Sequence, residues 1–100
     1  MNNTKISSSL WFTTLASGSS GNSSLIGDSD GNNFLVDCGI SCKRIVESLS
    51  DFSINTESVK GIFITHEHAD HISGLMMLMK KYKIPVFASL GTLSELTKCC

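Results

Sequence analysis

Six consecutive residues hold most of the side chains in this sequence that could do chemistry. They are His66-Glu67-His68-Ala69-Asp70-His71, and they include all three histidines of the 100-residue chain. In extended backbone, residues two apart point the same way, so His66 and His68 can present both imidazoles to one ion. As the chain turns into the following helix, Asp70 and His71 swing to the other side and could hold a second ion. The spacing predicts two adjacent metal half-sites.

Two adjacent divalent ions favour hydrolysis. They can share a bridging water, lower its pKa towards about 7, and stabilise the oxyanion that forms when hydroxide attacks a phosphate or acyl centre. A chance cluster of surface histidines and acids is the alternative, but three ligand-type spacings at once favour metal. The zincin pattern H-E-x-x-H is excluded because Asp70 stands four residues after His66. Zinc is the default ion for imidazole and carboxylate ligands, and manganese or iron also fits.

The elements around this motif predict a strand before it and a helix after it. Residues 59–65 contain the apolar run Ile62-Phe63-Ile64, which suits a strand buried on both faces. A strand over residues 84–88 follows the helix, and Thr92 with Glu95 forms a capping box for a last helix. The helix itself is predicted from apolar residues at offsets of three or four: Ile72, Leu75, Met76, Met79 and Tyr82. Its methionines are expected in the core.

Upstream of the motif, the sequence predicts a β-meander. Strands are expected over residues 9–15, 23–26 and 33–36, and the polar segments between them, dense in Ser, Gly, Asp and Asn, read as turns. Ser41 can cap a helix whose Ile45, Val46 and Leu49 share one face. The order β-β-β-α-β-α-β-α predicts an α+β or α/β fold, with one mixed sheet that has helices on one face.

Composition limits the other possibilities. One hundred residues make one domain at most, and a net charge of −1 excludes binding of nucleic acid or membrane by bulk electrostatics. The apolar run at residues 75–79 is far too short to span a membrane. Residues 10–12 imitate a signal peptide, but Thr13 and Thr14 interrupt the run, so we expect a strand and a cytoplasmic protein. The spacing of the four cysteines matches no zinc-knuckle pattern and favours free thiols: Cys38, Cys42, Cys99 and Cys100.

The motif H-x-H-x-D-H at His66, His68, Asp70 and His71 resembles the signature of the metallo-β-lactamase fold hydrolases. The resemblance implies that His66 and His68 ligate a first metal, and that Asp70 and His71 ligate a second. It also implies a catalytic role for Asp70 in orienting the bridging hydroxide. Asp37 resembles the strand-ending aspartate of the family's D-x-G segment, which would brace the metal loop without binding metal. A plain helix or turn cap is the alternative for Asp37.

A narrower resemblance comes from the run Ala16-Ser17-Gly18-Ser19-Ser20-Gly21-Asn22-Ser23, followed by Gly39-Ile40-Ser41 and Lys43. It is similar to the YycJ (WalJ) branch of the family, which is implied to contain DNA exonucleases. Four residues of this turn could contact a phosphate through backbone N–H groups and hydroxyls: Ser19, Ser20, Gly21 and Asn22. A tight hairpin with no ligand fits the same residues equally well. The lysines at 80, 81 and 83 could steer a nucleic-acid backbone, although solvated charges at a helix end are the commoner explanation.

The resemblance also implies that much of the family's domain lies outside this sequence. Family members run well beyond two hundred residues and form an αββα sandwich, so residues 1–100 are expected to be its N-terminal half, a partial domain. The family uses further histidine and aspartate ligands, and neither residue type occurs after His71. Two donors per ion hold metal weakly. We therefore expect an incomplete site, a missing C-terminal half or complementing chain, and an exposed apolar face.

Three functions remain open at this point. The first is a nuclease-type phosphodiesterase that acts on DNA through a binuclear metal-bound hydroxide. The second is thioester hydrolysis of the hydroxyacylglutathione type, which shares the motif H-x-H-x-D-H. The third is a non-catalytic truncated remnant, which would hold no metal tightly.

Overall fold

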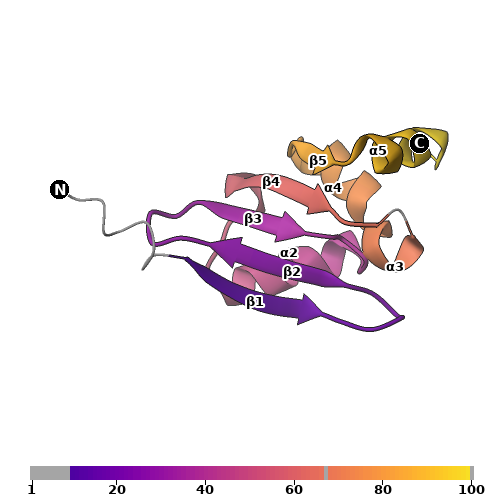
Figure 1. Cartoon of the computed structure of the whole chain (residues 1–100). Helices are drawn as coiled ribbons and strands as arrows, with labels where there is room; N and C mark the ends of the chain where they lie inside the picture. The colour runs from indigo at the N-terminus through magenta and orange to yellow at the C-terminus, as the bar shows by residue number, and fades with distance from the viewer. Residues whose placement is uncertain (1–9, 67, 100) are drawn as a thin grey trace.

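The computed structural model describes residues 10–66 and 68–99, with backbone only for Ala69, Asp70 and residues 97–99. Its core is one five-stranded sheet in which strands follow one another in chain order (Figure 1). The first three strands pair antiparallel, and the third, fourth and fifth pair parallel. The predicted mixed sheet is therefore confirmed. The strands are β1 (Trp11–Ala16), β2 (Ser23–Gly27), β3 (Asn33–Val36), β4 (Val59–Ile64) and β5 (Val86–Ala88).

Helices follow the strands in the predicted order. They are α2 (Cys42–Asp51), the 3-10 turn η1 (Thr56–Ser58), α3 (Ala69–Ile72), α4 (Leu75–Tyr82) and α5 (Leu90–Cys99). In Figure 1, α2 and α4 lie behind the sheet. Ser41 caps α2 as predicted, because its hydroxyl accepts a hydrogen bond from the N–H of Arg44 at 3.2 Å. In the part of the chain that the structure describes, no helix is long and apolar enough to span a membrane.

The hydrophobic core fills the space between the sheet and α2 and α4. Leu35 of β3 and Ile62 of β4 are paired across the parallel ladder, and both are fully buried. From the helices, Ile45, Leu49 and Leu78 are also fully buried and belong to the same cluster. Burying a side chain of this kind contributes about 1.5–3 kcal/mol relative to leaving it exposed. This cluster fixes α2 and α4 on one face of the sheet.

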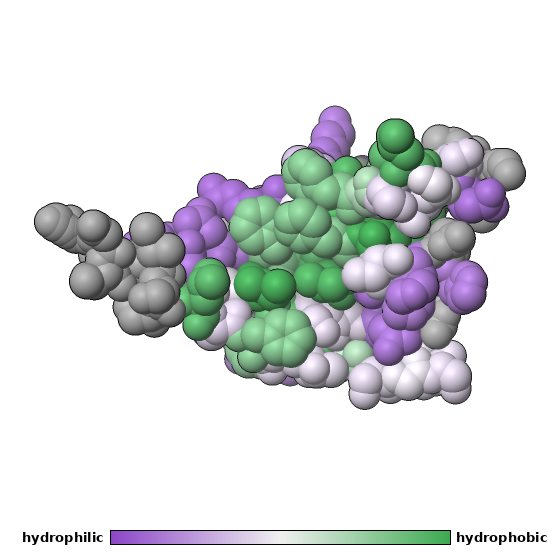
Figure 2. Space-filling model, viewed as in Figure 1, coloured by the Kyte–Doolittle hydropathy of each residue, from purple (hydrophilic) through white to green (hydrophobic). Residues whose placement is uncertain are grey.

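The opposite face of the sheet is apolar and open to solvent. We call it the open face and define it by cross-strand neighbours: Phe12, Ile26, Phe34, Val36, Phe63 and Phe87. Phe63 stacks on Phe87 with ring centroids 5.3 Å apart and lies 5.5 Å from Phe34. Figure 2 shows hydrophobic side chains gathered over this face. Phe12, Phe63 and Phe87 remain 63%, 41% and 47% exposed, so the expected exposed apolar face is present.

The helix after the motif differs from the prediction, because it is interrupted. The pattern predicted one helix through residues 72–82, but the structure has two, α3 and α4, separated by Ser73 and Gly74. The Ser73 hydroxyl donates to the carbonyl of Gly39 at 2.7 Å, and the N–H of Gly74 donates to the carbonyl of Cys38 at 2.8 Å. These bonds to the segment after β3 replace the hydrogen bonds of a continuous helix.

Two smaller predictions on this region are also wrong. Met76, Met77 and Met79 were expected in the core but are 43–49% exposed, because α4 turns Leu75 and Leu78 inward instead. The last helix begins at Leu90, two residues before the predicted cap Thr92. Ser89 caps it instead. Its hydroxyl accepts from the N–H of Thr92 at 3.2 Å.

Candidate metal centre

The predicted site lies where two neighbouring parallel strands end. β3 and β4 run in the same direction, so Asp37 after β3 and Thr65 after β4 emerge at the same edge of the sheet. Asp37 has a φ of +65°, in the left-handed region, which aspartate tolerates better than most residues. Its N–H continues the sheet by donating to the carbonyl of Phe63 at 2.8 Å. This backbone turn directs the carboxylate towards Thr65.

The carboxylate of Asp37 is buried and accepts three hydrogen bonds. Oδ1 accepts from the N–H of Thr65 at 2.7 Å, and Oδ2 accepts from the Thr65 hydroxyl at 2.6 Å. Oδ2 also lies 2.8 Å from Nδ1 of His71. Because a carboxylate only accepts, Nδ1 of His71 carries the proton and Nε2 carries the lone pair that a metal would take. Asp37 is 6% exposed, so these three donors replace water around its charge.

The three histidine rings lie near one another. The ring centroids of His66 and His71 are 4.7 Å apart, and those of His66 and His68 are 6.2 Å apart. Two imidazoles on one tetrahedral zinc ion have ring centres about 5.3 Å apart, since each Zn–N bond is about 2.1 Å. The rings of His66 and His68 therefore lie farther apart than one shared ion requires, whereas those of His66 and His71 are close enough to face neighbouring ions.

The structure does not test the complete ligand set. Among residues 10–66 and 68–99, it shows no group of three or more His, Cys, Asp or Glu side chains arranged to hold a metal ion. The carboxylate of Asp70, a predicted ligand, lies outside the described side chains, although its backbone is in α3 next to His71. Glu67 lies outside the described residues altogether. The imidazoles and their buried carboxylate partner nevertheless match the donor chemistry of a zinc-type site.

Backbone hydrogen bonds hold the helix that carries His71 against the segment after β3. The N–H of Cys38 donates to the carbonyl of His71 at 2.6 Å, and Gly74 bonds back to Cys38. Cys38 is fully buried, and burial raises the pKa of its thiol to about 12, with a further contribution from the charge of Asp37. Cys38 is therefore protonated at neutral pH.

The serine and glycine turn between β1 and β2 lies beside this segment. The N–H of Gly39 donates to the carbonyl of Asn22 at 2.8 Å, and a Cβ on Gly21 would lie only 2.7 Å from the carbonyl oxygen of Gly39. The Asn22 side chain closes the turn by bonding the N–H and the carbonyl of Gly18, at 3.1 and 2.8 Å. The predicted phosphate-contacting residues Ser19 and Ser20 are exposed. The turn therefore stands at the same end of the sheet as Asp37 (Figure 1).

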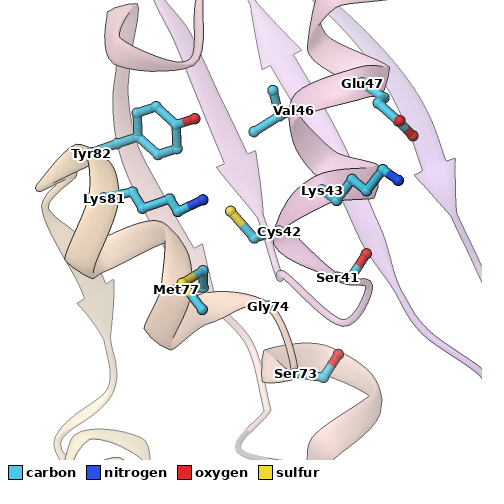
Figure 3. Close-up of a pocket in the computed structure, with 10 residues that line it drawn as sticks. All are labelled: Ser41, Cys42, Lys43, Val46, Glu47, Ser73, Gly74, Met77, Lys81 and Tyr82. Atoms are coloured by element: carbon cyan, nitrogen blue, oxygen red, sulfur yellow. The ribbon is translucent and has the colours of Figure 1, made fainter.

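A separate cavity lies behind the sheet, between α2 and α4. It has a volume of about 630 Å³, and Cys42 and Lys81 both project into it (Figure 3). Of the predicted metal ligands whose side chains the structure describes, His66, His68 and His71, none lines it. Lys80 and Lys81 occupy the last turn of α4, and Lys83 follows it, whereas the histidines precede its first turn. A helix of this length spans about 12 Å, so these lysines lie away from the candidate metal centre.

Sequence reasoning missed Thr65. Its hydroxyl donates to Asp37 and also lies 3.0 Å from Nδ1 of His66, so it joins two members of the site. A signal was present in the sequence, because a hydroxyl residue stands immediately before the first histidine at the predicted strand end.

Comparison with known proteins identifies the class that this fold and site define. The family model of the Metallo-beta-lactamase superfamily matches residues 16–99. The chain belongs to this superfamily. The fold agrees: the structure of the Rm3 metallo-beta-lactamase superposes with a TM-score of 0.71 and 27% identity, covering 85% of this chain and 32% of that chain.

Two curated relatives are similar over most of the sequence. One is exodeoxyribonuclease YycJ of Bacillus anthracis, 45% identical over 83 residues, which are 83% of this chain and 31% of that protein. The other is exodeoxyribonuclease WalJ of Streptococcus pneumoniae, 41% identical over 81 residues, which are 81% of this chain and 30% of that protein. The expected resemblance to this branch is confirmed. The chain spans less than a third of the length of these relatives.

Proposed function

We propose that this chain supplies the first metal ligands of a metal-dependent phosphodiesterase that acts on DNA. The observation that carries the proposal is the hydrogen-bonded cluster in which Asp37 orients His71 and, through Thr65, contacts His66. Imidazoles held by a buried carboxylate in this way are typical of metal ligands. The names of the similar proteins support DNA as the substrate over a thioester.

In this proposal, His66 and His68 bind one divalent ion, and Asp70 with His71 binds a second. The bound ions would polarise a phosphate oxygen and lower the pKa of an attacking water. Asp37 keeps His71 in the tautomer that presents Nε2. Ser19, Ser20, Gly21 and Asn22 form a turn at the same end of the sheet. In this proposal the exposed Ser19 and Ser20 contact a phosphate of the substrate, while Gly21 and Asn22 hold the turn through their bonds to Gly18.

We further propose that polypeptide other than these 100 residues completes the coordination. The chain offers two predicted donors per ion, and catalytic zinc sites use three protein ligands. No histidine or aspartate follows His71 in the sequence. The open face supports this view, because an apolar surface of this kind is typical of a protein contact. The missing segment would be either a continuation of the same chain or a complementing chain.

The test uses the native protein purified from its source, with its intact mass recorded. Its activity is measured on linear double-stranded DNA and, in parallel, on a hydroxyacylglutathione thioester, and its metal content is measured after dialysis. We expect about two ions per molecule, DNA hydrolysis, and at least a 100-fold loss of turnover and loss of one ion in Asp70→Ala. Asp30→Ala is the matched control, because Asp30 is an exposed carboxylate in the turn between β2 and β3.

Three results would overturn the proposal. Thioester hydrolysis without DNA hydrolysis would assign the other substrate class. Absence of bound metal together with absence of both activities would make the protein a non-catalytic remnant. Full activity in Asp70→Ala would reject the assignment of Asp70.

A further inference from the structure

We infer that Thr65 is a positioning residue that sets the tautomer of His66, an inference that rests on the proposed metal-binding role of His66. A hydroxyl group has one proton to donate. Thr65 gives that proton to Oδ2 of Asp37, at 2.6 Å. The contact between Thr65 Oγ1 and His66 Nδ1, at 3.0 Å, therefore requires Nδ1–H of His66 as the donor.

This assignment determines which nitrogen of His66 can bind metal. A neutral imidazole carries one N–H, so a proton on Nδ1 leaves the lone pair on Nε2. Thr65 thus does for His66 what Asp37 does directly for His71. Both rings are connected by hydrogen bonds to the same carboxylate oxygen, Oδ2 of Asp37. His71 bonds to it directly, and His66 bonds to it through the Thr65 hydroxyl. One buried charge therefore orients two imidazoles.

The backbone fixes the hydroxyl in this role. The N–H of Thr65 donates to Oδ1 of Asp37 at 2.7 Å, so the main chain and the side chain of Thr65 hold both carboxylate oxygens. His66 is exposed, and its ring is next to solvent, where water can accept or donate equally well. The Thr65 hydroxyl is therefore the contact that distinguishes the two tautomers of His66.

The tautomer can be read in the metal-free chain by two-bond 1H–15N NMR correlation at a pH where the imidazoles are neutral. Two variants are compared: Thr65→Val keeps the shape but removes the hydroxyl, and Thr65→Ser keeps the hydroxyl. We expect His66 as Nδ1–H in the wild type and in Thr65→Ser, and a shift towards Nε2–H in Thr65→Val. His71 is the internal control, since its bond to Asp37 does not use the hydroxyl and its tautomer should not change.

Zinc affinity, measured by competition with a chelator, gives a second readout. We expect a loss of about 10–100-fold in Thr65→Val and a change of less than about threefold in Thr65→Ser. Predominant Nε2–H at His66 in the wild type would overturn the inference, and this result needs no variant to fold. An unchanged tautomer and unchanged zinc affinity in a folded Thr65→Val would also overturn it. The NMR readout uses no metal and no substrate, so its failure is distinguishable from failure of the proposed hydrolysis.

Discussion

Replacement of Asp37 by asparagine is the sharpest test of how the candidate site is built. Asparagine has nearly the same shape and tolerates the left-handed backbone at this position. It offers one oxygen where aspartate offers two. If the amide nitrogen replaces Oδ2, it faces the Thr65 hydroxyl and Nδ1 of His71, and if it replaces Oδ1, it faces the N–H of Thr65. In the first orientation these contacts survive only if the Thr65 hydroxyl and Nδ1 of His71 both become acceptors, and in the second the N–H of Thr65 loses its acceptor.

The magnitude follows from the three bonds and the burial of Asp37. A hydrogen bond to a charged group contributes about 1.5–3 kcal/mol, and a buried donor left unpaired costs a similar amount. We expect Asp37→Asn to lower the free energy of unfolding by about 2 kcal/mol. Asp37→Ala removes the acceptors of all three hydrogen bonds and puts alanine, which tolerates the left-handed region less well than aspartate, at a φ of +65°, so we expect a loss of about 4 kcal/mol. Asp37→Gly should recover about 1 kcal/mol of that loss.

The assay is urea unfolding of the 100-residue chain, followed by the fluorescence of its single tryptophan. Trp11 stacks on Phe52 with ring centroids 6.4 Å apart, so its environment changes when β1 separates from the end of α2. Asp30→Asn at an exposed carboxylate is the control and should stay within about 0.5 kcal/mol of the wild type. A similarly small change in Asp37→Asn would refute the hydrogen-bond argument. Equal stability of the glycine and alanine variants would refute the argument from backbone strain.

Two further predictions concern the support of the site. Burial raises the pKa of Cys38 from its usual value near 9 to about 12. The neutral thiol therefore stabilises the fold fully below pH 9, and this contribution to the free energy of unfolding is lost between pH 9 and 12. In urea titrations Cys38→Ala should make the free energy of unfolding fall less steeply over this pH range, and an unchanged slope would contradict the prediction. A Cβ on Gly74 would collide with the carbonyl oxygen of Ile40, so Gly74→Ala should lower the free energy of unfolding by about 3 kcal/mol in the same assay. The control is Gly91→Ala, whose Cβ would meet nothing within 4 Å and which should change this free energy by less than about 1 kcal/mol. Equal effects of the two variants would refute the packing argument.

Much of the fold could be predicted because local patterns agreed with the final packing. The alternation of β2 and β3 and the Ser41 cap are each determined by neighbouring residues. The prediction that β4 is buried on both faces is wrong, because Phe63 lies on the open face and is 41% exposed. The break between α3 and α4 could not be predicted in this way. It depends on bonds from Ser73 and Gly74 to Gly39 and Cys38, which lie more than thirty residues earlier in the sequence.

The site, like the fold, combines contacts within one short segment with contacts between distant segments. Because the three histidines lie within six residues, the sequence alone places their imidazoles in one region, and the structure shows three neighbouring rings. The contact between Asp37 and His71 joins residues 34 apart in the sequence, so only the family resemblance pointed to it. The role of Thr65 required the register of β3 against β4, which no local pattern fixes. Metal ligation by the four predicted side chains stays a prediction.

The order of the strands has a consequence for how the protein reaches this structure. Each described strand pairs with its neighbour in the chain, but the ladders differ in how much chain they enclose. The antiparallel pairs of β1, β2 and β3 are joined by short turns, whereas the parallel ladders pair Asn33 with Val59 and Ile62 with Val86. Closing the longer loops costs more entropy, so the parallel ladders are expected to form after the antiparallel ones. Residues 37 to 71 contain all the contacts between Asp37, Thr65, His66 and His71. The histidine cluster is therefore expected to assemble in the same kinetic step as the β3–β4 ladder.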